Sequence, residues 1–134
     1  MVDTSVWIDY LRGGKTPATE ALERVFIEAT PFAITSVIYQ EILQGADSPE
    51  SFKKLSEYFG TQRFLHPLDL IETFSRAAEL YSRCRSAGAT IRNTIDCLIA
   101  QIALEHDAMV LHSDKDYLYM AEVISELRLF ENCI

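Results

Sequence analysis

Short apolar runs alternate with longer amphipathic stretches along the chain, and this alternation limits its fold more than any other feature. Apolar residues in the longer stretches recur with the helical period of about 3.6 residues. Strands that alternate with helices typically form a parallel sheet covered by helices. The sequence therefore predicts an α/β fold of three layers, α/β/α, in which helices flank a short central parallel sheet of four to five strands. The expected strands are residues 1–3, 32–34, 63–65, 108–111 and 128–130.

Polar residues with capping side chains mark where the helices should begin. Pro17 directly after Thr16 is typical of a helix start, because proline is favoured at the first helical position. Gly45 and Gly88 are expected to end helices. The expected N-caps are Thr4 or Ser5, Thr16, Thr35 or Ser36, Ser48, Asp69, Asn93 or Thr94, and Asp114.

The size of the chain, 134 residues with 49% hydrophobic residues, suits one domain over residues 1–134 with a real core. No apolar run approaches the roughly 20 residues that a membrane helix needs. The first residues carry an acid at Asp3 and no basic stretch, which is unlike a signal peptide. We therefore expect a cytoplasmic protein without a membrane partner.

The charge balance is acidic, with 12 Lys and Arg against 20 Asp and Glu, a net charge of −8. Such a balance normally argues against a polyanionic partner, because phosphate binding rests on Lys and Arg. The three cysteines, Cys84, Cys97 and Cys133, form no C-x-x-C pair. This spacing excludes a zinc knuckle, and Cys84 and Cys97 are expected to be buried helix residues.

Four carboxylates fall where strands end or helices begin. Asp3 and Asp114 follow expected strands, Glu41 lies on a helix after the second strand, and Asp96 lies in a first helical turn. Each alone is an ordinary capping or surface residue. Together at one sheet edge they would repel one another unless a cation neutralised them. Mg²⁺ or Mn²⁺ suits such oxygen ligands.

Four strings in this order resemble the PIN domain, and specifically the VapC-type toxins of type II toxin–antitoxin modules. They are DTSVWI at 3–8, TSVIYQEILQG at 35–45, DCLIAQIA at 96–103 and LHSDKDY at 111–117. The resemblance implies a metal-dependent endoribonuclease toxin that hydrolyses RNA, with one or two Mg²⁺ or Mn²⁺ ions as cofactor. It leaves the kind of RNA open among transfer, ribosomal and messenger RNA.

The resemblance also assigns site residues. It implies Asp3, Glu41, Asp96 and Asp114 as the catalytic, metal-holding acids, and Asp116 shares or takes over the fourth place. Thr4 or Ser5 would orient the attacking water. The family usually has Phe where this chain has Tyr117.

The implied partners are a small VapB-type antitoxin, whose C-terminal segment blocks the site, and a second copy of the chain in a homodimer or toxin–antitoxin hetero-oligomer. Helices near residues 7–11, 22–26 and 52–59 could form an apolar groove for the antitoxin segment. Bases that could line a groove for RNA are Arg12, Lys15, Arg83, Arg85, Arg92 and Lys115.

The residues themselves leave other functions open. A phospho-receiver-like regulator would need a Lys after the last strand, where none follows residues 128–130, and a haloacid-dehalogenase-like phosphatase would need Asp at Ser5. A non-enzymatic α/β protein that binds a partner is the further alternative. His66, His106 and His112 form no ligand set, and His112 is expected at the surface.

Overall fold

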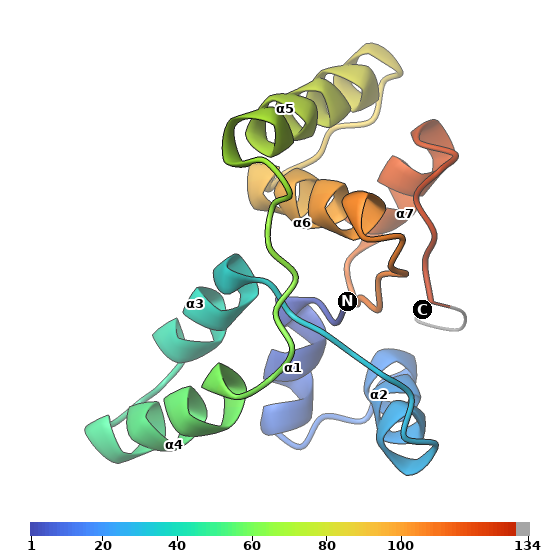
Figure 1. Cartoon of the computed structure of the whole chain (residues 1–134). Helices are drawn as coiled ribbons and strands as arrows, with labels where there is room; N and C mark the ends of the chain where they lie inside the picture. Colours follow the sequence, from blue (N-terminus) through green and yellow to red (C-terminus); the bar gives the residue numbers. More distant parts are fainter. Residues whose placement is uncertain (131–134) are drawn as a thin grey trace.

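Seven α-helices account for most of the structure, a computed structural model that describes residues 1–130 (Figure 1). They are α1 (Thr4–Leu11), α2 (Pro17–Ile27), α3 (Ser36–Gln44), α4 (Pro49–Gly60), α5 (Leu70–Ser86), α6 (Thr94–Glu105) and α7 (Lys115–Val123). Helix α1 packs on α2 and α3, and α3 packs on α4. Helices α5, α6 and α7 pack on one another as a second group, drawn above the first in Figure 1. No helix within residues 1–130 is both long enough and apolar enough to cross a bilayer.

Capping side chains begin the helices largely where the sequence predicts. The observed N-caps are Thr16, Thr35, Ser48, Asp69, Asn93 and Asp114, each accepting a backbone N–H of the first turn. Helix α1 differs, because its N-cap is Asp3 rather than Thr4 or Ser5. The Asp3 carboxylate accepts the backbone N–H of Ser5, so a candidate metal ligand also fixes the start of a helix.

The predicted three-layer α/β/α fold, with a central parallel sheet of four to five strands, is wrong. Among residues 1–130, extended segments meet as three isolated parallel bridges: Val2 with Leu111, Ile34 with Phe64, and Val110 with Leu129. The physical reason is that helices begin too soon after the extended segments. Helix α1 starts at Thr4, two residues after the first bridge, and α3 starts at Ser36, two residues after the second. No room is left for the consecutive pairs that a ladder of hydrogen bonds requires.

Single backbone hydrogen bonds nevertheless tie the extended segments together. The N–H of Asp3 donates to the carbonyl of Leu111 at 2.9 Å, and the N–H of Leu111 donates to the carbonyl of Met1 at 2.8 Å. The N–H of Val2 donates to the carbonyl of Ala33 at 3.0 Å. These bonds place the residue before α1 beside the segment that leads into α7, which brings Asp3 close to Asp114 and Asp116.

Buried side chains pack around this junction in both helix groups. Trp7 is 1% exposed and packs against the rings of Phe59, Phe32 and Phe26, with centroids 4.9, 5.7 and 6.1 Å away. Residues 96–103 of α6 are all buried. As predicted, Cys84 and Cys97 are buried and free, whereas Cys133 lies outside the described residues.

Candidate metal centre

The five predicted acids come from four helices. Asp3 and Asp114 are the N-caps of α1 and α7, Asp96 and Asp116 lie in the first turns of α6 and α7, and Glu41 lies within α3. Helix starts are electrostatically favourable places for carboxylates, because the backbone N–H groups and the helix dipole are positive there. This explains how the chain can hold several negative side chains at one place.

Three of the acids, Asp96, Asp114 and Asp116, form the tightest group. Each offers a carboxylate oxygen, and these oxygens all lie within 4.8 Å of one another. Asp96 and Asp116 are buried, at 7% and 2% exposure, whereas Asp114 is half-buried. The group therefore has a closed inner side and a side that faces solvent.

Asp3 is held beside this group by donors on both of its carboxylate oxygens. Its Oδ1 accepts the Tyr117 hydroxyl at 2.8 Å, and its Oδ2 accepts the Ser5 hydroxyl at 2.6 Å. The Ser5 hydroxyl in turn accepts the backbone N–H of Ser113 at 3.3 Å. The carboxylate of Asp3 is thus fixed between α1 and α7.

Glu41 is joined to the same region through Thr4. The Thr4 hydroxyl donates to Glu41 Oε1 at 2.8 Å, which links the start of α1 to the middle of α3. Glu41 is half-buried, in line with its place among apolar neighbours on α3. Thr4 and Ser5, predicted to orient water, therefore bond to two of the acids.

The other four acids act electrostatically on Asp96. Burial first, and then the charges of Asp3, Asp114, Asp116 and Glu41 in decreasing order, together raise the pKa of Asp96 from its ordinary value of 3.8 to about 7. Ionising such a carboxyl costs free energy, through loss of contact with water and through repulsion by its neighbours. A positive charge placed among these oxygens would relieve it.

The donor set fits a hard divalent cation. Several carboxylate oxygens converge on a partly open site, and Mg²⁺ and Mn²⁺ prefer such ligands together with water. Asp96, Asp114 and Asp116 could together hold an ion, whereas Asp3 and Glu41 lie outside this group of three and act on Asp96 through their charges.

Arg92 also lies at the site, as one of the bases predicted near it. Its Nη2 donates to Asp114 Oδ1 at 3.2 Å, and its Nε lies 3.5 Å from Asp116 Oδ1. Arg85 instead lies over the Tyr81 ring, with its guanidinium carbon 5.6 Å from the centroid, and Arg83 belongs to the last turn of α5.

The structure reveals two features that the sequence did not predict. His112, expected at the surface, is fully buried, and burial lowers the pKa of its imidazole. Its ring lies 5.1 Å from that of Tyr117. Tyr117 is buried too, and burial raises the pKa of its phenol well above the usual value, so that the hydroxyl stays protonated and donates to Asp3. The departure from the usual Phe marks this position in the sequence, but it does not identify Asp3 as the partner of the hydroxyl.

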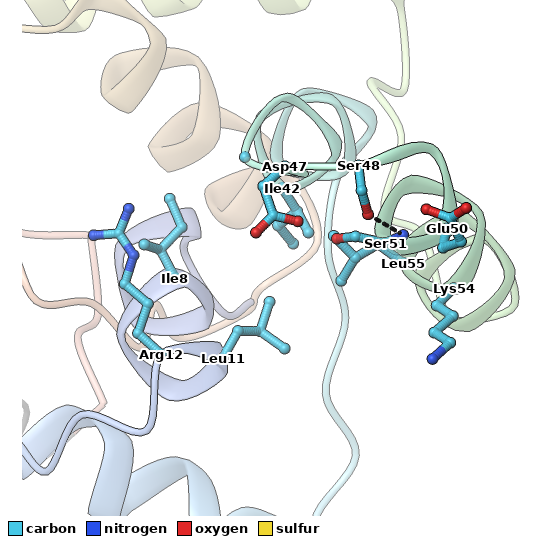
Figure 2. Close-up of a pocket in the computed structure, with 11 residues that line it drawn as sticks. Ile8, Leu11, Arg12, Ile42, Asp47, Ser48, Glu50, Ser51, Lys54 and Leu55 are labelled. Carbon is cyan, nitrogen blue, oxygen red and sulfur yellow. Dashed lines mark hydrogen bonds between the residues drawn. The ribbon is translucent and has the colours of Figure 1, made fainter.

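A groove of about 720 Å³ lies between α1, the end of α3 and the start of α4. Figure 2 shows Ile8 and Leu11 of α1 on one side, with Ile42, Ser51 and Leu55 on the other. A second hollow, of about 360 Å³, shares Leu11 and Leu55 with it and reaches the aromatic cluster around Trp7. The groove follows two of the three predicted helix segments, 7–11 and 52–59, and the second hollow adds Phe26 from the third.

Comparison with known proteins finds a matching family, similar sequences and a similar structure. The family described as PIN domain matches residues 1–123. The chain is 35% identical over 124 residues to VapC ribonuclease Mb1587 of Mycobacterium bovis and to ribonuclease VapC11 of Mycobacterium tuberculosis, covering 92% of this chain and 92% of each relative. Its fold is similar to a chain in a toxin–antitoxin complex from Klebsiella pneumoniae, with a TM-score of 0.66 and 20% identity over 96% of this chain and 98% of that one.

Proposed function

Because this chain belongs to the PIN-domain family, we propose that it is a VapC-type endoribonuclease toxin that uses Mg²⁺ or Mn²⁺ to hydrolyse RNA. The observation that carries the proposal is the group of Asp96, Asp114 and Asp116, whose carboxylate oxygens lie within 4.8 Å of one another, with the charges of Asp3 and Glu41 also acting on Asp96. We take Asp3, Glu41, Asp96, Asp114 and Asp116 as the acids of its active site, and residues 1–134 as a single domain that acts in the cytoplasm.

The reaction adds water across a P–O bond of the RNA backbone. A bound divalent ion would activate the water and neutralise charge on the phosphate oxygens in the transition state. In this proposal Asp96, Asp114 and Asp116 would hold the ion. Asp3 would add a carboxylate whose orientation is fixed by Tyr117 and Ser5, and the Thr4 hydroxyl holds the carboxylate of Glu41. The protein itself contributes mainly by positioning the reacting groups and by supplying charge.

A comparison of acid-to-amide variants tests this proposal. We expect Glu41→Gln and Asp96→Asn to abolish RNA cleavage by purified protein and growth arrest on expression. Glu122→Gln is the matched control, because Glu122 is an exposed acid on α7, outside the cluster. EDTA should stop cleavage, and Mg²⁺ or Mn²⁺ should restore it. Full cleavage by a folded Asp96→Asn variant would contradict the mechanism.

We further propose that the groove between α1, α3 and α4 receives the C-terminal segment of a small VapB-type antitoxin. Support comes from its apolar floor, with Ile8, Leu11 and Leu55, and from charged residues of both signs at its edges, Arg12 and Glu50 among them. Leu11→Asp should weaken inhibition by the antitoxin without changing RNA cleavage. Inhibition that survives removal of the antitoxin's tail would count against this assignment.

A homodimer is the other proposed assembly, and an exposed stripe on α5 supports it. Ile71 and Phe74 are 79% and 53% exposed, and the exposed Ala78 and the half-buried Tyr81 continue the stripe at spacings of four and three residues. Acidic residues begin α5 and Arg83 and Arg85 end it, so an antiparallel pair related by a two-fold axis would match opposite charges. Ile71→Glu should convert the dimer to a monomer in light scattering, whereas a monomeric wild-type chain would contradict the proposal.

A further inference from the structure

We infer that Arg92 binds the RNA backbone at the candidate metal centre, with its guanidinium on a nonbridging oxygen of a phosphate beside the carboxylates. This inference rests on the proposed ribonuclease function and adds the residue that attracts the substrate. Arg92 is a positively charged side chain that lies among the carboxylates of the site.

The backbone of Arg92 is fixed by the site itself. Its N–H donates to Asp116 Oδ2 at 3.0 Å, while the side chain reaches Asp114 and the other oxygen of Asp116. The next residue, Asn93, is the N-cap of α6, whose first turn carries Asp96. Arg92 therefore sits at the rim of the acid group rather than on a free loop.

The end of the Arg92 side chain is open to solvent. The side chain is 73% exposed although it contacts two carboxylates. A guanidinium carries five N–H donors, and within residues 1–130 its recorded side-chain contacts use Nη2 and Nε. The Nη1 group is left for a further acceptor. The planar fork of donors matches the oxygens of a phosphate.

Stability alone does not account for this arrangement. The ion pair with the partly exposed Asp114 adds little to folding. The pair with Asp116 neutralises a buried carboxylate, but it does not require the rest of the guanidinium to stay open to solvent. A cation at this place is, however, what an RNA phosphate needs in order to approach, because the chain carries a net charge of −8 and the site holds five acids. Arg92 thus offsets the repulsion where the phosphate must come closest.

Arg128 offers a matched control at the far end of α6. It donates to Asp107 at 2.7 Å and its side chain is 51% exposed, so its chemistry resembles that of Arg92. Asp107 follows the C-terminal end of α6, whereas Asp96 lies in its first turn. At about 1.5 Å per helical residue, some 15 Å separate the two places.

The test measures RNA binding without cleavage. A fluorescein-labelled single-stranded RNA of mixed sequence is titrated with the full chain carrying Glu41→Gln, at several KCl concentrations, with EDTA and with Mg²⁺. Adding Arg92→Gln should weaken binding about tenfold at low salt and lower the slope of log Kd against log [KCl] by about 0.7, the effect of one lost phosphate contact. Arg92→Lys should keep the slope, and Arg128→Gln should change neither quantity.

Several outcomes separate the possible explanations. In the cleaving wild-type background, Arg92→Gln should raise KM more than it lowers kcat. If Arg92→Gln leaves RNA binding unchanged and tightens Mn²⁺ binding, Arg92 is a counter-ion of the carboxylates and the inference is overturned, while the ribonuclease proposal stands. If the Glu41→Gln chain binds no RNA and the wild type cleaves none, the proposed function itself fails.

Discussion

Replacing Asp96 by Asn should make the metal-free protein more stable while removing its activity. The unfolded chain loses the Asp96 proton near its ordinary pKa of 3.8, whereas the folded chain keeps it up to about pH 7. The free energy of unfolding therefore falls as pH rises between these values, because the unfolded state releases the proton first. Asn stays neutral at every pH and avoids this loss.

The size of the effect follows from the pKa. A difference of about three units corresponds to about 4 kcal/mol at 1.36 kcal/mol per unit. Water and neighbouring side chains respond to the charge, so we expect Asp96→Asn to gain about 2–4 kcal/mol at pH 8. At pH 4.5 the gain should shrink to about 1 kcal/mol, because folded Asp96 is then protonated.

Urea unfolding in EDTA at both pH values measures this difference, and thermal unfolding should show a rise in Tm of about 5–15 °C at pH 8. Saturating Mg²⁺ should narrow the gap, because the ion stabilises the wild type. Glu122→Gln should change little at either pH. The reasoning is refuted if Asp96→Asn is destabilising at pH 8, or if its gain is equal at both pH values.

Three further predictions concern the contacts around the site. Tyr117→Phe removes the hydroxyl that donates to Asp3 and should lower the free energy of unfolding by about 1–3 kcal/mol in urea; the exposed Tyr119→Phe should not, and equal losses would refute the role of that bond. Thr4→Val leaves Glu41 without its recorded donor and should slow single-turnover RNA cleavage about tenfold, with recovery in Thr4→Ser. Mn²⁺ at about 100 times its Kd should raise the free energy of unfolding of the wild type by about 2.7 kcal/mol, and an unchanged urea midpoint would show that no ion binds.

Helix starts were predictable from the sequence because their causes are local. Thr16 before Pro17 and Ser48 before Pro49 form caps from side chains within three residues, and both helices begin as predicted. The sheet was not predictable, because the same residues carry two competing signals. The pattern of residues 1–3 predicts a strand, but the carboxylate of Asp3 caps a helix that starts at Thr4. Because the helix begins there, this segment pairs with residue Leu111 through a single bridge.

The candidate site shows a similar division. The acids and their order could be read from the strings that resemble PIN domains, although their role as metal ligands stays a prediction. The contacts that support them could not, because they join distant residues: Tyr117 and Asp3 are 114 positions apart, and Arg92 and Asp116 are 24 apart. The burial of His112 likewise depends on how α7 packs and leaves no local pattern.

The span of the acids along the chain has a consequence for the timing of synthesis. Asp114, Asp116 and Tyr117 are added to the growing chain more than 110 residues after Asp3. At about 5–20 residues per second, a ribosome needs several seconds to bridge that interval. A nascent or prematurely released fragment that ends before Asp116 thus lacks the complete set of carboxylates, so the site can be assembled only after translation has reached α7.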